Sequence, residues 1–180
     1  HVVVVDGART AFAKAGTDLA SMSAVDLGVL ALQEAVARSK ISYSDIEHVI
    51  IGNIGQPADA ANISRVISLF AGVPKHVPAY TVQRNCASGM EAVAQARRMI
   101  ASGEADCIVA GGTESMSQIP LLLSEDMKAI FMKFAFARSV GERLGALASL
   151  KPRFLKPVVA VEVGLTDPVS GMNMGQTAER

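Results

Sequence analysis

Hydrophobic and polar positions follow two patterns over the first 112 residues of the chain. Short apolar runs rich in β-branched residues are typical of strands, and apolar residues spaced three and four apart are typical of helices. The first run, residues 2–5, has no polar alternation, which predicts a central strand covered on both faces. The predicted strands are residues 2–5, 48–51, 80–83 and 106–110, and the predicted helices are residues 23–38, 63–70 and 86–101.

The order of these elements, βαβαβαβ, determines the expected fold class. Such alternation predicts an α/β fold with a mostly parallel sheet, helices on both faces and right-handed crossovers. Ser23 followed three residues later by Asp26 matches a capping box at the start of the first helix. Gly72 and Gly103 follow the second and third helices, as glycine often does at a helix end. We therefore assign residues 1–112 to a core domain.

The composition and the hydrophobic pattern of the chain change after the core domain. Residues 113–180 combine a Met- and Phe-rich helical stretch, two Lys-Pro pairs and a Gly-rich tail. We expect them to form an inserted or appended loop region of helical and irregular structure. The apolar face of the helical stretch consists of Met127, Ile130, Phe131 and Phe134, which have helical spacing.

Composition excludes several classes of protein. Half of the residues are hydrophobic and 19% are charged, so the chain can bury enough apolar surface to fold. Lys plus Arg and Asp plus Glu number 17 each, so no overall charge attracts nucleic acid. The apolar runs are far shorter than the roughly 18 residues of a membrane-spanning helix. We therefore expect a soluble protein with no nucleic-acid partner.

The number and spacing of the cysteines indicate the cellular compartment and exclude some metal sites. Cys86 and Cys107 are the only two cysteines, and no CxxC pair occurs. The chain can build neither a disulfide framework nor a Cys-rich zinc site. We expect a reducing, cytoplasmic location and no bound metal.

The turn after the third predicted strand contains a candidate nucleophile. Ligands of parallel α/β sheets bind beyond the carboxyl ends of the strands, and Cys86 lies there, between a strand end and a helix start. The positive end of a helix stabilises a thiolate by up to about 2 kcal/mol. Free N–H groups at that end can receive the oxyanion of an attacked carbonyl. The alternative is a buried apolar cysteine, which is how we interpret Cys107.

Four sequence motifs resemble those of the thiolase family. Residues 85–92, Asn-Cys-Ala-Ser-Gly-Met-Glu-Ala, are similar to the family's nucleophile turn. Residues 6–12 resemble its first turn, and residues 110–117 resemble the end of its fourth strand. Residues 164–179 resemble the loop near the acyl-CoA thioester. The motifs occur in the family's order over the whole chain, and the last two favour a thiolase over the related ketoacyl synthases.

The resemblance implies a function and a set of site residues. It implies acyl transfer between acyl-CoA and acetyl-CoA, forming or cleaving 3-ketoacyl-CoA, as in fatty-acid β-oxidation. Cys86 would be the catalytic nucleophile that carries the acyl group as a thioester. Leu165 and Met174 would bind substrate beside the pantetheine and acyl chain, and ordinary loop packing is the alternative for both. Coenzyme A thioesters would be the substrates, with no metal or redox cofactor.

The resemblance also implies that this chain is the N-terminal part of a thiolase. The family's activating histidine and second cysteine lie in its C-terminal half, and none of His1, His48 and His76 has the family's Gly-His-Pro setting. Asn173 with Gln176 predicts a helix start only a few residues before the last one. We expect a core domain that lacks its last strand, a chain inactive by itself, and a complete protein that is a homodimer or higher oligomer. The alternative is a noncatalytic thiolase-fold fragment that binds acyl-CoA or a partner chain.

A basic segment, residues 124–160, lies between the last two motifs. It resembles the longer loop region of thiolases in multifunctional β-oxidation complexes, which makes such a complex a candidate partner. Three roles compete: a cover over the acyl pocket, a CoA-phosphate or partner contact, and a membrane-surface helix, with a solvated basic loop as the remaining alternative. Basic residues five apart are rotated by about 140° on a helix, so they form no single polar face, and we rank membrane association below the other roles. The basic residues are Lys128, Lys133, Arg138, Arg143, Lys151, Arg153 and Lys156.

Overall fold

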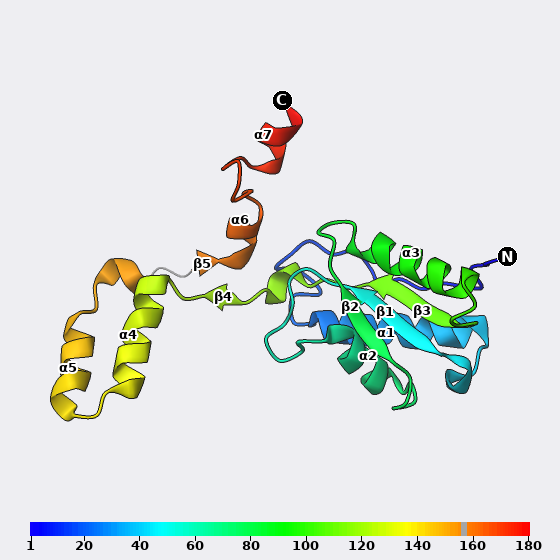
Figure 1. The fold of residues 1–180 in the computed structure, drawn as a ribbon, viewed down its shortest axis with the longest axis horizontal. Helices are drawn as coiled ribbons and strands as arrows, with labels where there is room; N and C mark the ends of the chain where they lie inside the picture. The colour runs from blue at the N-terminus through cyan, green and yellow to red at the C-terminus, as the bar shows by residue number, and fades with distance from the viewer. Residues whose placement is uncertain (156–157) are drawn as a thin grey trace. The chain divides into compact units, whose positions relative to one another are not determined.

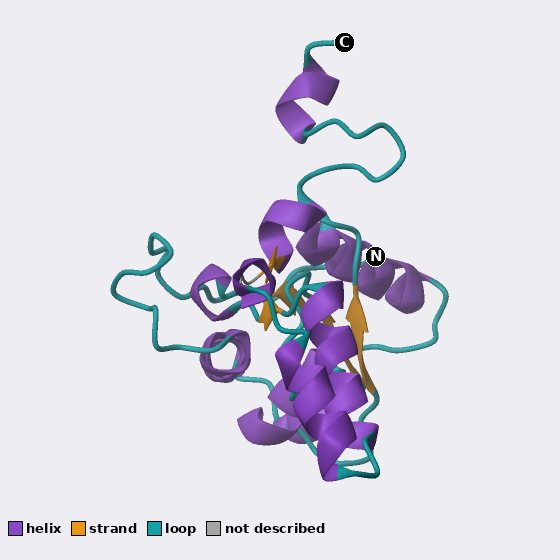
Figure 2. Ribbon diagram, turned by 90° about the vertical axis from the view of Figure 1, so that its left-hand side faces the viewer, coloured by secondary structure: helices purple, strands orange, loops and turns teal. Residues whose placement is uncertain are grey.

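The computed structural model describes residues 1–155 and 158–180 and divides the chain into two compact units. Unit 1 comprises His1–Ile119, and unit 2 comprises Pro120–Arg180. Helices make up most of the regular structure, and the strands are few and short (Figure 2).

Unit 1 is built on a three-stranded parallel sheet with the strand order β2-β1-β3. The central strand β1 is buried over its last four residues, as its apolar sequence predicts. Ile50 in the middle of β1 lies opposite Tyr80 on one side and Ala110 on the other. Each strand begins and ends within two residues of its predicted bounds. The strands are β1 (His48–Gly52), β2 (Ala79–Val82) and β3 (Ile108–Gly112).

Three helices alternate with these strands and match the predicted helices to within two residues. The predicted capping box is present, and hydrogen bonds from Ser23 lower the pKa of the Asp26 carboxyl below its usual value. The second helix ends at Gly72, whose φ of 98° favours glycine. The helices are α1 (Ala24–Ser39), α2 (Ile63–Ala71) and α3 (Ser88–Ala101).

The helices cover both faces of the sheet, with α3 on one side and α1 and α2 on the other (Figure 1). Alternate side chains of a strand point to opposite faces. Val49 and Ile51 therefore pack with residues of α1 and α2, whereas Ile50 packs with Ala92 and Ala96 of α3. This arrangement confirms the predicted α/β class with a parallel sheet between helices.

The prediction of a central strand at residues 2–5 is wrong. Residues 1–14 form neither helix nor strand, and Val3, Val4 and Val5 are 73%, 86% and 64% exposed. A strand needs a neighbour that satisfies its backbone N–H and C=O groups, and no strand in the described part of the chain pairs with this run. The apolar residues are suited to burial but lack a pairing partner, so unit 1 has three strands rather than four.

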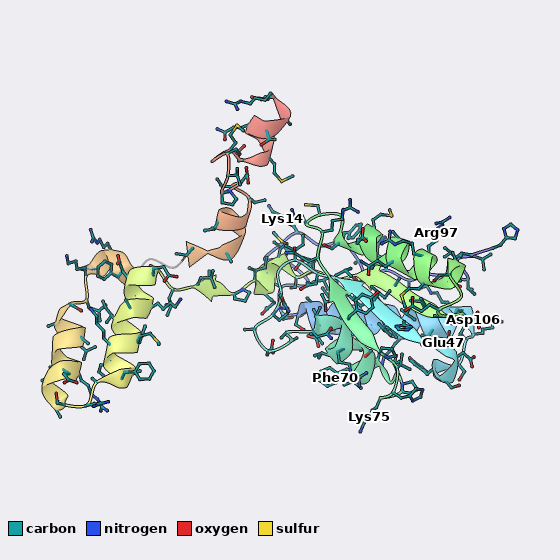
Figure 3. All side chains as sticks on the ribbon, in the orientation of Figure 1. Lys14, Glu47, Phe70, Lys75, Arg97 and Asp106 are labelled. Carbon is teal, nitrogen blue, oxygen red and sulfur yellow. The ribbon has the colours of Figure 1, made fainter. Side chains whose placement is uncertain are left out.

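A carboxylate joins the beginnings of β1 and β3. Glu47, just before β1, accepts hydrogen bonds from the backbone N–H groups of Asp106 and Cys107, just before β3. These two bonds lower the pKa of Glu47 below its usual value. Figure 3 shows Glu47 and Asp106 at the same edge of the sheet. The contact links the two strands at the end of the sheet opposite to the turn that contains the candidate nucleophile.

Unit 2 begins with a two-residue strand, continues in a helical hairpin and ends in short elements. The predicted helix around Met127 is confirmed, with Met127 and Ile130 buried but Phe131 54% exposed, so only part of its apolar face is covered. No helix among the described residues is both long and apolar enough to cross a membrane. The elements are β4 (Leu121–Leu122), α4 (Glu125–Phe136), α5 (Val140–Ala148), β5 (Val158–Val159), α6 (Ala160–Gly164) and α7 (Met174–Ala178).

The basic segment of unit 2 also contains acidic residues. Glu125 and Asp126 lie in the first turn of α4 and Lys133 in its last turn, which suits the helix dipole. Glu142 accepts a hydrogen bond from the backbone N–H of Arg138 at 2.7 Å. Seven basic and three acidic residues leave a net charge of +4 over residues 124–160. Lys156, one of the seven, lies outside the described residues.

Candidate active site

Two glycines allow the start of α3 to lie against the ends of β1 and β3. A Cβ atom on Gly52 would lie 2.4 Å from the backbone carbonyl carbon of Ser88. A Cβ atom on Gly112 would lie 3.2 Å from the Cα of Gly89. A side chain at either position would push the helix away from the sheet. The close approach places the beginning of α3 at the carboxyl edge of the sheet, where parallel α/β folds bind ligands.

Cys86 lies in the turn that leads from β2 into this helix. It is exposed to solvent and precedes Ser88, the first helical residue, by two positions. The helix thus begins two residues later than predicted. The first N–H groups of a helix lack partners within the helix, and the helix dipole is positive at that end. An exposed thiol in this position is suited to nucleophilic chemistry.

The backbone of the Cys86 turn has an unusual conformation. Asn85 has a φ of 48°, in the left-handed region that costs most residues about 1–2 kcal/mol and that Asn tolerates better than most. The Ser88 hydroxyl accepts a hydrogen bond from the backbone N–H of Arg84 at 2.7 Å and donates one to the C=O of Asn85 at 2.7 Å. The N–H of Ser88 donates to the same carbonyl at 3.0 Å. Ser88 therefore holds both residues that precede Cys86.

An ion-pair network ties the turn to the body of α3. Glu91 accepts hydrogen bonds from the guanidinium groups of Arg84 and Arg98, both at 2.7 Å. The donors Arg84, Gln95 and Arg98 lower the pKa of Glu91 to about 2, so its carboxylate is charged at neutral pH. Gln95 also accepts a hydrogen bond from the Tyr80 hydroxyl in β2 at 3.0 Å. Strand, turn and helix are thus joined by one polar network.

Cys107 has a different environment. It immediately precedes β3 rather than lying inside the strand, and it is partly buried. Burial, together with the negative charges of Asp45 and Glu47, raises the pKa of its thiol. The thiolate is the nucleophilic form, so this environment disfavours reaction at Cys107 near neutral pH.

The loop after β1 borders a pocket next to the Cys86 turn. The Glu114 carboxylate accepts hydrogen bonds from the backbone N–H groups of Ile54 at 2.9 Å and Gly55 at 3.1 Å, which fixes this loop. The pocket has a volume of about 340 Å³ and is lined by this loop, by β2 and by Gln83. Cys86 does not line it, so the pocket lies next to the turn without containing the thiol.

The two predicted substrate-binding residues lie in unit 2, whereas Cys86 lies in unit 1. Leu165 follows α6 and Met174 begins α7, and they are 50% and 63% exposed. Their neighbours Thr166 and Asn173 pair with each other in an antiparallel bridge. The structure thus brings Leu165 and Met174 to the two ends of one closed loop and leaves both apolar side chains accessible.

In the described residues, neither a histidine nor a group of metal-binding side chains lies beside Cys86. His1 and His76 are exposed, and His48 begins the central strand, at the end of the sheet away from the Cys86 turn. No group of three or more His, Cys, Asp or Glu side chains among the described residues could hold a metal ion. The turn therefore contributes a thiol and backbone N–H groups rather than a general base.

The sequence matches the family described as thiolase, N-terminal domain, over residues 2–180. The match spans nearly the whole chain, and the chain therefore belongs to the thiolase family. This result confirms the resemblance that the four motifs indicate.

Individual relatives agree with the family assignment. Over all 180 residues the chain is 36% identical to 3-ketoacyl-CoA thiolases of Yersinia pestis (strain Pestoides F) and Yersinia pseudotuberculosis (serotype O:1b, strain IP 31758). The crystal structure of the Bacillus anthracis acetyl-CoA acetyltransferase is similar over 98% of the chain, with a TM-score of 0.80 and 32% identity. An Ascaris suum thiolase in complex with coenzyme A is similar over 97%, with a TM-score of 0.78 and 30% identity. The chain spans 41% of the curated relatives and 40% of each solved chain.

The sequence pattern locates the Cys86 turn but not the side chains that hold it. In the sequence Ser88 stands out only as a small residue beside the thiol, although a Ser at a helix start is a known hydrogen-bonding signal. The Arg84–Glu91 pair spans seven positions and depends on how the turn enters the helix. Gly52 resembles an ordinary strand end, and only its contact with Ser88 shows why a side chain would not fit.

Proposed function

We propose that this chain supplies the nucleophile of an acyl-CoA C-acyltransferase of the thiolase type. The observation that carries the proposal is an exposed Cys86 thiol ahead of α3, within a thiolase N-terminal domain. The enzyme would pass an acyl group through a Cys86 thioester to or from acetyl-CoA, forming or cleaving 3-ketoacyl-CoA. The names of the Yersinia relatives support this substrate class, and fatty-acid β-oxidation is the process in which we place it.

The first half-reaction is a thioester exchange. The Cys86 thiolate attacks the carbonyl carbon of acyl-CoA, a new C–S bond forms, and the carbonyl oxygen takes the negative charge. The bond from that carbon to the CoA sulfur then breaks, and CoA leaves as a thiolate that takes up a proton. The N–H groups of Ala87 and Ser88 already donate to carbonyls of the turn, so we propose that a neighbouring N–H, such as that of Cys86, stabilises the oxyanion. Cys86 provides the nucleophile and no electrons are gained or lost, so we propose a reaction without metal or redox cofactor.

The same proposal assigns the chain to two functional regions. Residues 1–112 would form the core domain that positions Cys86, and residues 113–180 would bind acyl-CoA. Leu165 and Met174, accessible at the ends of one loop, would contact the pantetheine and the acyl chain. The Ascaris thiolase, solved in complex with coenzyme A, supports coenzyme A as a ligand of this fold.

The second half-reaction needs groups beyond this chain. Condensation requires removal of a proton next to the thioester carbonyl of acetyl-CoA, and a positioned base typically contributes about 10²- to 10⁴-fold. No histidine in the described residues lies in hydrogen-bonding contact with Cys86. We propose that the base and the activating histidine come from a C-terminal part of the complete protein, which would act as a homodimer or higher oligomer.

Acetylation by acetyl-CoA tests the nucleophile directly. In the complete protein we expect mass mapping to find an acetyl group on Cys86, lost in Cys86→Ala and retained in the matched control Cys107→Ala. Iodoacetamide near neutral pH should label Cys86 much faster than Cys107, because burial raises the pKa of Cys107. Acetylation that persists without Cys86, or equal labelling of both thiols in folded protein, would contradict the proposal.

An assay of acetoacetyl-CoA cleavage tests whether this chain needs groups from the C-terminal part for catalysis. We expect no measurable cleavage of acetoacetyl-CoA by CoA with the 180-residue chain alone. Activity should appear when the C-terminal part is supplied, as a continuous chain or a co-expressed fragment, and should vanish with Cys86→Ala. Turnover by the chain alone at the complemented rate would show that no further groups are needed.

The basic segment of unit 2 can be tested separately. Replacing Lys128, Lys133, Arg138 and Arg143 by Gln should change acyl-chain preference or binding to a β-oxidation partner, while acetoacetyl-CoA turnover stays nearly intact. The reason is that these charges lie in α4, in α5 and between them, far from Cys86 in the sequence, and include none of the proposed site residues. Flotation with anionic liposomes at physiological salt, strong in wild type and lost in the variant, would favour membrane association instead.

A further inference from the structure

We propose that Ser88 is a positioning residue for the chemistry of Cys86, an inference that rests on the proposed function. Its hydroxyl bridges the backbone N–H of Arg84 and the backbone C=O of Asn85, the two residues before Cys86. One side chain thus holds the turn that carries the thiol, and it acts through the backbone rather than on the substrate.

The bridge controls the orientation of the peptide group between Asn85 and Cys86. The Asn85 carbonyl accepts hydrogen bonds from both donors of Ser88, the backbone N–H at 3.0 Å and the hydroxyl at 2.7 Å. A peptide group is planar, so fixing this carbonyl also fixes the direction of the Cys86 N–H in the same plane. Loss of the hydroxyl leaves one of the two hydrogen bonds and allows the plane to rotate.

The turn requires this support because its backbone is unfavourable. Asn85 has a φ of 48°, and left-handed residues other than glycine persist where their surroundings hold them. The Ser88 hydroxyl also satisfies the N–H of Arg84, close to the end of β2. A single oxygen therefore supports both residues of the turn that precede the thiol.

Ser88 is itself fixed by packing. It is 4% exposed, and the end of β1 lies so close that a Cβ on Gly52 would contact its backbone. Arg84 is held independently through its side chain by Glu91 at 2.7 Å. Ser88→Ala should therefore keep α3 and the Arg84–Glu91 ion pair and lose only the hydrogen bonds of the hydroxyl.

Ser68 offers a matched control for the loss of a buried helical hydroxyl. It is fully buried in α2, and its hydroxyl donates to the C=O three residues earlier, that of Arg65, at 2.9 Å. Ser88 makes the same kind of bond to Asn85. Because α2 and α3 cover opposite faces of the sheet, Ser68→Ala removes a similar bond away from the Cys86 turn.

The experiment measures Cys86 acetylation by acetyl-CoA in the complete protein, with each rate normalised to the folded fraction found by circular dichroism. In Ser88→Ala we expect the maximal rate to fall about 10- to 100-fold, as small displacements of reacting groups do, with little change in the half-saturating acetyl-CoA concentration. Ser88→Thr keeps the hydroxyl and should recover most of the wild-type rate. Ser68→Ala should stay within about twofold of wild type, because distant sites act independently.

Three outcomes would overturn the proposal: a wild-type rate in Ser88→Ala, an equal fall in Ser68→Ala, or a Ser88→Thr rate as low as that of Ser88→Ala. If wild-type Cys86 is not acetylated at all, the proposed function fails, and iodoacetamide labelling decides the role of Ser88 by itself. The pH profile of Cys86 alkylation should then change in Ser88→Ala and not in Ser68→Ala. Identical profiles in all three proteins would refute the positioning role.

Discussion

Units 1 and 2 bury their apolar side chains in different ways. In unit 1, β1 lies between helices on both faces, and residues such as Ile50 and Ile67 are fully buried. In unit 2, the buried apolar residues of the described chain are Met127, Ile130 and Ala146, all in the α4–α5 hairpin.

The difference follows from topology. A central parallel strand has neighbours on both sides and both faces, contributed by segments far apart in the sequence. Two helices in a hairpin share a single seam, so their outer faces keep apolar side chains such as Leu144 exposed. Unit 1 is therefore suited to holding the Cys86 turn in one conformation, and unit 2 is suited to offering apolar contacts to a ligand or partner.

Truncation of a buried isoleucine should give the largest difference in lost stability between the two units. We expect Ile67→Ala to lower the free energy of unfolding of unit 1 by about 3–5 kcal/mol, because a fully buried Ile leaves a cavity when it is truncated. The matched change Ile130→Ala should cost unit 2 about 2 kcal/mol, at the low end of the usual range, since its site can collapse more easily. Hydrogen exchange followed residue by residue under increasing urea measures both losses. Equal losses would show that the hairpin is packed as tightly as the sheet.

Replacement of a glycine by alanine should change the stability of the two units in opposite directions. Gly52→Ala should destabilise unit 1 by about 1–3 kcal/mol or more, because the new Cβ meets the backbone of Ser88. Gly145→Ala in α5 should stabilise unit 2 by about 0.5–1 kcal/mol, because nothing lies within 4 Å and alanine favours helix. Thermal unfolding of the two variants tests the signs. Destabilisation by Gly145→Ala would mean that α5 has a close neighbour at this position.

The ion-pair network of Glu91 in unit 1 should make a smaller contribution to stability, and this contribution should depend on pH. The pKa of Glu91 is lowered from 4.5 to about 2, so its charged form stabilises the fold above the unfolded-state pKa. That contribution should decrease as the pH falls from about 4.5 to about 2. The stability difference between wild type and Glu91→Gln should therefore be constant above about pH 5 and disappear near pH 2.

The control for this prediction is the exposed Glu34–Arg38 pair of α1. Glu34→Gln should change stability by about 0.5 kcal/mol or less, as is usual for a solvent-exposed ion pair. Urea unfolding at a series of pH values measures both variants. A difference for Glu91→Gln that stays constant down to pH 2 would show that the carboxylate is not held by its arginine partners.

Local patterns in the sequence predict most of unit 1. Apolar spacing and end signals such as Ser23 and Gly72 place three helices and three strands within two residues of their observed bounds, because these signals act between neighbours in the chain. The position of Cys86 between a strand and a helix is predictable for the same reason. The pattern fails at residues 2–5, where an apolar run has no strand to pair with in the described structure.

By itself the sequence determined the α/β class, the approximate bounds of three helices and three strands of unit 1, and the turn that contains Cys86. The tertiary structure decided the strand order β2-β1-β3, the contact of Gly52 with the start of α3, and the hydrogen bonds by which Ser88 and Glu91 hold the turn. The physical reason is that hydrophobic periodicity reports which side of an element prefers burial. Strand pairing, close backbone approach and polar contacts depend instead on segments that meet only when the chain has folded.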